Sequence, residues 1–192
     1  VLIARRALPD GERREKADLL HDLIRAMRAC PVPLIAAVEG GAAGAGLSLA
    51  LACDLIISSE EARFTAAYVK AGLVPDAGLT SAMARLLPRP LAMELCLLGR
   101  PITAIRFAEL GAVNRLVPAG QAFDTALQYA DQLVAGPRAA QGVIRGLVAA
   151  AYETHEADQL HAERDAMAHA AGGAEAAQGI AAFLEKRKPE CG

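Results

Sequence analysis

The chain opens with an amphipathic stretch that is followed by short, uniformly apolar runs. Four large apolar residues recur at helical spacing within residues 13–29, which predicts a helix with one apolar face. The "CPVP" after it ends that helix, because proline disfavours helical continuation. Residues 34–38 and 55–58 are short, apolar and contain β-branched side chains, so we expect buried strands there and a short third strand at 63–65.

The remaining pattern is mainly helical. One helix follows the glycine-rich residues 40–46, Thr103 is placed to cap another, and Gly111 is placed to follow its end. A short strand is expected at 112–117. The helix between Thr103 and Gly111 is predicted at 104–110. Further helices are predicted at residues 79–87, 90–98, 121–134, 138–151, 155–170 and 173–187. This order predicts an α/β fold class with parallel strand pairing, followed by a helical C-terminal region.

Composition excludes several classes of partner. The 192 residues carry 20 basic and 22 acidic side chains, for a net charge of −2, and 54% are hydrophobic. We therefore expect a globular protein without a nucleic-acid partner. No apolar run reaches the ~18 residues of a membrane span, so no membrane partner is expected. The four scattered cysteines favour a cytoplasmic location, and the histidine spacing favours no metal site.

The stretch "GGAAGAG" precedes a helix-forming run and invites a choice between three uses. A phosphate-binding loop would need a following Lys, and a dinucleotide site would need the glycines in the order G-x-G-x-x-G, which is reversed here. Two uses stay open on the residues alone. The loop is either a tight structural turn or an oxyanion hole, in which a helix N-terminal N–H stabilises a developing negative charge.

Several longer stretches carry a resemblance to a known family. "PVPLIAAVEGGAAGAGLSLALACDLIISSEEARF", "KAGLVPDAGLT", "AMELCLLGRPITA" and "ELGAVNRLV" follow one another, and the chain closes with "AAQGIAAFLEKRKPECG". Together they resemble the enoyl-CoA hydratase/isomerase family, also called the crotonase superfamily, from about residue 32 to the end. Within that family, the phenylacetate-type ring-opening (epoxyphenylacetyl-CoA) isomerases have the most similar glycine loop and "GLVPD".

The resemblance implies a crotonase-like spiral of ββα units. It assigns residues 1–136 to the α/β core and residues 137–192 to a helical region for trimerisation and CoA contact. It also implies that the early strands and the first oxyanion donor lie upstream of Val1. Members bind acyl-CoA thioesters and assemble as homotrimers or hexamers. Coenzyme A is then part of the substrate, and no separate cofactor is expected.

The resemblance also assigns site residues and marks two departures. The second oxyanion donor falls on the backbone N–H of Ala45, beside Gly44 in the substrate-binding loop. The two glutamates that family hydratases use correspond here to Ser48 and Tyr68, and neither is a carboxylate. Asp76, in "GLVPD", matches an acidic residue of the isomerases and is the expected proton carrier. The alternative is that Asp76 merely starts a turn or helix.

Three functions follow from these residues. The favoured one is an acyl-CoA isomerase that uses Asp76. The alternatives are a hydratase that uses non-standard groups and a non-catalytic acyl-CoA binding or assembly protein. Phe183 and Lys186 match family positions that contact CoA, or they form a solvated helix end. Asp54 is expected to serve as a cap or turn residue.

Overall fold

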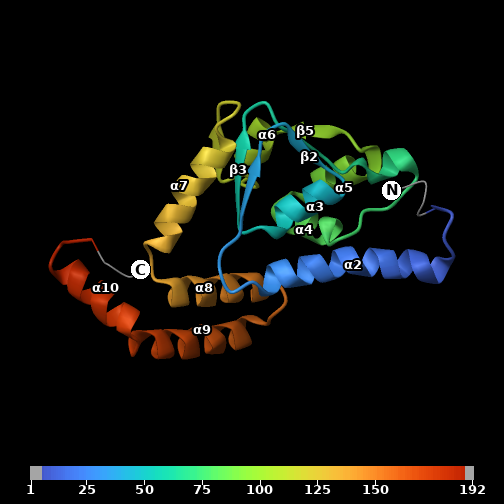
Figure 1. Cartoon of the computed structure of the whole chain (residues 1–192). Coiled ribbons are helices and arrows are strands. Elements are labelled where there is room, and N and C mark those ends of the chain that lie inside the picture. The colour runs from blue at the N-terminus through green and yellow to red at the C-terminus, as the bar shows by residue number, and fades with distance from the viewer. Residues whose placement is uncertain (1–5, 189–192) are drawn as a thin grey trace. The chain divides into compact units, whose positions relative to one another are not determined.

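A computed structural model describes residues 6–188 (Figure 1). Its contacts divide the chain into two compact units, one made of Val1–Cys30 with Leu34–Ala126 and the other of Pro31–Pro33 with Leu127–Gly192. The functional division predicted between residues 136 and 137 stays a prediction. Within the described part of the chain, none of the helices combines the length and the apolar character that crossing a bilayer requires.

The first unit contains a parallel sheet in the order β1-β3-β6. It is built from β1 (Ile35–Val38), β3 (Leu55–Ser59) and β6 (Arg115–Val117). Ile35 of β1 pairs with Leu55 of β3, and Ile57 of β3 pairs with Arg115 of β6. Ile57 is fully buried, as expected for the central strand of a parallel sheet that is covered on both faces. The predicted strands and their parallel pairing are confirmed.

A second sheet has the order β2-β4-β5, with β2 (Gly41–Ala43) parallel to β4 (Arg63–Thr65) and β5 (Pro101–Thr103) antiparallel to β4. Gly41 is required here, because a Cβ at this position would overlap the Arg63 carbonyl oxygen of the neighbouring strand. From β1 to β4 the chain thus alternates between the sheets. β1 and β2 precede one helix, and β3 and β4 precede the next helices, which is a spiral of ββα units.

The helices of the first unit pack on these sheets. They are α2 (Asp10–Ala29), α3 (Ala45–Ala52), the 3₁₀ helix η1 (Ala67–Ala71), α4 (Leu79–Leu86), α5 (Arg89–Leu98) and α6 (Ala104–Glu109). The predicted cap is confirmed, because the Thr103 hydroxyl accepts a hydrogen bond from the Arg106 N–H at 3.1 Å. α3 packs against α4, and the Phe64 and Phe107 rings meet in the core with centroids 4.9 Å apart.

α7 (Ala122–Val134) begins in the first unit and ends in the second. The second unit continues with α8 (Arg138–Ala150), α9 (Glu156–Ala171) and α10 (Ala174–Leu184). α8 packs against α9, and α9 packs against α10 (Figure 1). The last helix ends three residues earlier than the predicted 187 and the strand β6 is shorter than the predicted 112–117, while the other helices agree within three residues.

Candidate active site

The glycine loop turns the chain from β2 into α3. Gly44 precedes the helix with φ 54° and ψ −125°, a conformation that favours glycine. Its N–H donates to the Thr65 carbonyl at 3.0 Å, which ties the loop to β4, and its carbonyl accepts from the N–H groups of Leu47 and Ser48. The loop therefore fixes where the N-terminus of α3 points.

The N-terminus of α3 offers two backbone donors. Ala45 and Gly46 are exposed, and no acceptor among the described residues bonds to either N–H. Outside glycine, positive φ occurs in the described chain only at Ala77 and Lys186, so Ala45 keeps an ordinary helical backbone. The first N–H groups of a helix lie at the positive end of its dipole and lack internal partners. This end of α3 therefore presents two backbone N–H groups of the kind that can hydrogen-bond an anionic oxygen.

Three side chains meet beside this helix start: Ser48 on α3, Tyr68 on η1 and Asp76 in the loop before α4. The Tyr68 hydroxyl donates to Asp76 Oδ1 at 2.7 Å. Ser48 Oγ lies 3.3 Å from the Tyr68 hydroxyl and 3.2 Å from the Asp76 carbonyl oxygen. It also lies 3.5 Å from the Gly44 carbonyl oxygen. Ser48 thus links the glycine loop to the backbone of the carboxylate residue.

The backbone around Asp76 is unusual. Ala77 is buried with φ 52°, and Gly78 follows with φ 77°, so two consecutive residues adopt left-handed conformations. A non-glycine residue in this region costs of order 1–3 kcal/mol, and such strain clusters at functional sites. The α4 N-terminus makes no side-chain capping bond; the Leu79 N–H instead bonds to the Asp76 carbonyl oxygen at 3.1 Å. The Asp76 carboxylate therefore does not cap α4.

The Tyr68 phenol is held in its neutral, hydrogen-donating form beside the Asp76 carboxylate. Burial raises the pKa of Tyr68 to about 12, a shift that the Ser48 hydrogen bond opposes and the Asp76 carboxylate reinforces. The phenol is consequently protonated at neutral pH and keeps its hydrogen for donation. Asp76 Oδ1 receives that hydrogen, whereas Oδ2 has no hydrogen-bond donor among the described residues. One oxygen of the carboxylate is thus held by a hydrogen bond and the other is not.

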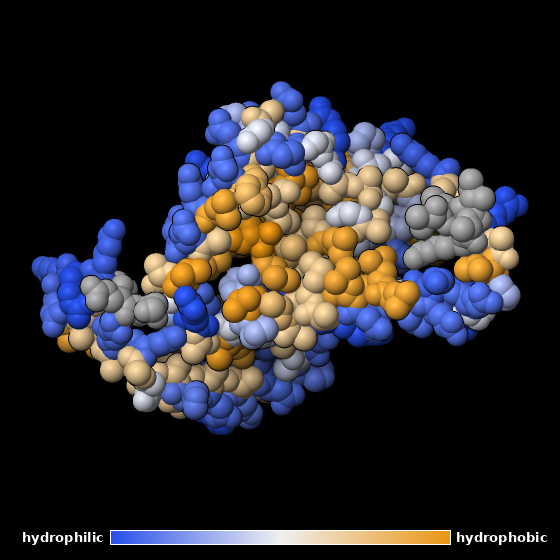
Figure 2. Space-filling view, in the orientation of Figure 1, coloured by the Kyte–Doolittle hydropathy of each residue, from blue (hydrophilic) through white to orange (hydrophobic). Residues whose placement is uncertain are grey.

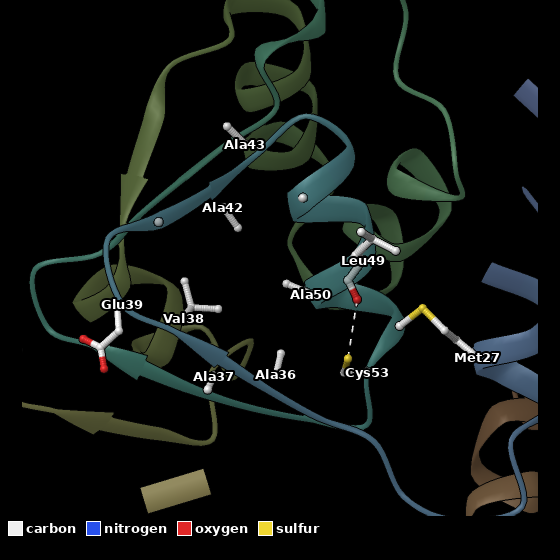
Figure 3. A pocket seen from close by; sticks show the side chains of 12 residues that line it. Met27, Ala36, Ala37, Val38, Glu39, Ala42, Ala43, Leu49, Ala50 and Cys53 are labelled. Atoms are coloured by element: carbon white, nitrogen blue, oxygen red, sulfur yellow. Dashed lines mark hydrogen bonds between the residues drawn. The ribbon is translucent and has the colours of Figure 1, made fainter. Parts of the chain in front are cut away.

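A groove of about 480 Å³ runs along a different face of α3 (Figure 3). Gly46, Leu49, Ala50 and Cys53 line it from α3 at helical spacing, opposite residues 36–39 and 41–43 and beside Met27. Glu39, its one carboxylate, accepts from the N–H groups of Gly120 and Ala122 at 2.8 and 2.7 Å. The groove is therefore an apolar surface without a free acid or base. In the sequence, only the helical spacing of residues 46, 49, 50 and 53 pointed to this groove.

The remaining predicted residues fall into two groups. Asp54 was expected as a cap or turn residue; in the structure its Oδ2 accepts from the Leu34 N–H at 2.7 Å, a longer-range contact that fixes the entry into β1. Phe183, whose exposed fraction is 82%, and Lys186 lie at the end of α10 in the second unit. Their role in CoA contact stays a prediction. The expected first oxyanion donor lies outside the described residues.

Comparison with known proteins places this geometry in a family. The sequence pattern of the enoyl-CoA hydratase/isomerase family matches residues 7–192. The chain is 40% identical over 171 residues to 1,2-epoxyphenylacetyl-CoA isomerase of Escherichia coli K12, covering 88% of this chain and 65% of the relative. It is 36% identical over 186 residues to a probable mitochondrial enoyl-CoA hydratase 2 of Arabidopsis thaliana, covering 96% and 62%.

The crystal structure of an enoyl-CoA hydratase from Polaromonas sp. JS666 has a TM-score of 0.95 and 42% identity, covering 98% of this chain and 73% of that one. The chain therefore belongs to the enoyl-CoA hydratase/isomerase family, and the predicted resemblance and crotonase-like fold are confirmed. It spans 65% and 62% of the length of the two relatives named above.

Proposed function

We propose that the protein is an acyl-CoA isomerase, in which Asp76 moves a proton along an unsaturated acyl thioester and the Ala45 N–H stabilises the enolate oxygen. The observation that carries the proposal is the cluster beside α3. Asp76 is its only carboxylate, and one of its two oxygens has no donor among the described residues. Ser48 and Tyr68 complete the cluster with two neutral hydroxyl groups.

The proposed reaction balances with Asp76 as the only proton carrier. In a 3-enoyl thioester, the Asp76 carboxylate takes a proton from C2, and the electron pair spreads over C2 to C4 and onto the thioester oxygen. That oxygen accepts the Ala45 N–H, for which one such donor is typically worth ~2.7–4 kcal/mol of transition-state stabilisation. The Asp76 carboxylic acid then returns the proton to C4, which moves the double bond to C2–C3 and restores the carboxylate.

The same residues favour isomerisation over hydration. Addition of water needs one group to activate the water and one to protonate carbon, and the serine and tyrosine that stand at the hydratase glutamate positions are weak acids and bases. The Tyr68 hydrogen is moreover engaged by Asp76. A hydratase with Asp76 as its single acid–base group is the second candidate, favoured by the hydratase name of the Arabidopsis relative. A non-catalytic thioester-binding protein is the third.

The test is a product assay on the full-length protein with 3-enoyl-CoA and 2-enoyl-CoA. The proposal expects conversion of 3-enoyl-CoA into 2-enoyl-CoA, at least 100-fold slower in Asp76→Asn, and unchanged in the control Asp124→Asn, an exposed position on α7. Formation of 3-hydroxyacyl-CoA from 2-enoyl-CoA without double-bond migration supports the hydratase instead. Thioester binding without any turnover supports the binding protein.

We also propose that the protein assembles as a homotrimer or hexamer. Large apolar residues reach the surface in both units (Figure 2). In the second unit, Ile144, Val148 and Met167 have exposed fractions of 58%, 63% and 71%. Exposed apolar patches of this kind mark association surfaces. The cytoplasmic location and the absence of a separate cofactor stay predictions.

A further inference from the structure

We propose that Tyr68 is a positioning residue, whose phenol holds Asp76 by one carboxylate oxygen so that the other is presented to the substrate carbon. This inference rests on the proposed function, because it assigns a role relative to the proton carrier. It gives the tyrosine a task different from the water activation performed at that position in two-glutamate hydratases.

Counting hydrogens fixes the direction of the contacts. Tyr68 has one hydroxyl hydrogen, and its shortest contact, 2.7 Å, is to Asp76 Oδ1. A carboxylate can only accept, so the phenol donates. Ser48 also has one hydrogen for three oxygens, those of Tyr68, Asp76 and Gly44, at 3.2–3.5 Å. When Ser48 donates to the phenol oxygen, it polarises the phenol and strengthens its donation to Asp76.

The surrounding backbone explains why such a restraint is needed. Asp76 lies in the loop between η1 and α4, and the two left-handed residues after it set its Cα without fixing its side chain. The carboxylate makes no capping bond to α4. Among the described residues, the Tyr68 hydroxyl is therefore the only hydrogen-bond donor to the Asp76 carboxylate.

The high pKa of Tyr68, about 12, keeps the phenol protonated, and so able to donate, at neutral pH. The other ionisable side chains on the neighbouring helices η1, α4 and α5 are Lys70, Arg85, Arg89, Glu94 and Cys96. From α2, the guanidinium of Arg28 lies beside Gly78, two residues after Asp76. The described helix α3 carries none. All of these are retained when only the phenol oxygen is removed, so Tyr68→Phe isolates its contribution.

The experiment compares the full-length wild type with Tyr68→Phe, Ser48→Ala and the control Tyr129→Phe, which lies on α7. Isomerisation of 3-enoyl-CoA is measured as kcat and KM across pH. Tyr68→Phe is expected to lower kcat about 10- to 100-fold, the value of a hydrogen bond to a charged group, with KM within about twofold. The acidic limb of kcat/KM should move to higher pH, because the donated hydrogen bond stabilises the charged carboxylate.

Ser48→Ala should produce the same pattern with a smaller loss, and Tyr129→Phe should match the wild type. An unchanged kcat and pH profile in Tyr68→Phe, with Asp76→Asn inactive, overturns the positioning role and leaves the proposed function intact. A wild type that does not isomerise defeats the proposed function first. In that case, a carboxyl-carbon NMR titration of Asp76 still decides the positioning contact. A midpoint at higher pH in Tyr68→Phe supports the contact, and an unchanged midpoint overturns it.

Discussion

The Tyr68 hydroxyl and Asp76 Oδ1 lie 2.7 Å apart, and they bring together a 3₁₀ helix and the loop that follows it. The contact forms beside the N-terminus of α3, where Ser48 Oγ lies 3.5 Å from the Gly44 carbonyl oxygen and 3.2 Å from the Asp76 carbonyl oxygen. A neutral donor, a carboxylate and two free backbone N–H groups are thereby assembled from three segments of chain. Proton transfer next to a stabilised oxyanion is the chemistry that this combination supports.

Substitution of Gly44 tests the backbone geometry of the glycine loop. Gly44→Ala is expected to lower the free energy of unfolding by about 1–3 kcal/mol, because φ 54° with ψ −125° strains any residue with a Cβ. Urea unfolding measures this change. The control Gly146→Ala, with open space around its Cβ inside α8, should be neutral or stabilise by about 0.5–1 kcal/mol. An equally stable Gly44→Ala protein would contradict the loop geometry.

The pH dependence of stability reports on the Tyr68 phenol. Its pKa is raised to about 12, mainly by burial, from an unfolded value of 10.0. Since the folded state binds the proton more tightly, the contribution of the phenol is fully present below pH 10 and is lost as the pH rises toward 12. The free energy of unfolding should therefore fall more steeply over this interval in the wild type than in Tyr68→Phe. Parallel curves for the two proteins would contradict the shift.

Glu175 tests the packing inside the second unit. Its two carboxylate oxygens accept from the Ala139 and Ala140 N–H groups at 3.0 and 3.2 Å, at the start of α8, where Pro137 supplies no side-chain cap. Glu175→Ala is expected to lower the free energy of unfolding by about 0.5–2 kcal/mol, the range for lost helix caps. Thermal or urea unfolding measures it, with the exposed Glu15→Ala on α2 as the control. Equal losses in both variants would show that the cap contributes nothing specific.

The proposed assembly is tested by mass in solution. Combining Ile144→Glu with Val148→Glu places two charges on the exposed apolar side of α8, and we expect a trimer or hexamer to dissociate toward monomer. Sedimentation equilibrium measures the mass. His161→Glu, at an exposed polar position on α9, should leave the mass unchanged. A monomeric wild type would refute the assembly, and a double variant of unaltered mass would place the interface elsewhere.

Much of the fold was predictable, because the hydrophobic pattern dominates where elements are buried. The run at 55–58 contains consecutive large apolar residues, two of them β-branched, as is typical of a strand covered on both faces, and the structure places β3 at Leu55–Ser59 in the centre of its sheet. Thr103 was equally readable as a cap, because the hydrogen-bonding geometry of a cap is local. By contrast, β2 and β5 have three residues each, and they are strands only because β4 lies between them.

The candidate site was predictable as a set of residues but not as a geometry. The family resemblance singled out Gly44, Ser48, Tyr68 and Asp76, which the structure brings together. The course of the backbone after Asp76 depends on Ala77 adopting φ 52°, which no pattern signals because alanine rarely occupies that region. The positions of Phe183 and Lys186 relative to this cluster depend on how the two units are arranged, which local sequence does not encode.

The most direct test of the central claim traces the transferred hydrogen itself instead of measuring only the product that forms. The full-length protein is incubated in H₂O with 3-enoyl-CoA deuterated at C2, and deuterium in the product and in the solvent is located by NMR. If Asp76 carries the proton, the wild type and Asp124→Asn remove one deuterium from C2 and deliver it to C4, or to water where the acid exchanges before returning it, whereas Asp76→Asn removes none above the uncatalysed rate. Loss of deuterium from C2 at the wild-type rate in Asp76→Asn would contradict the role of Asp76 as the proton carrier.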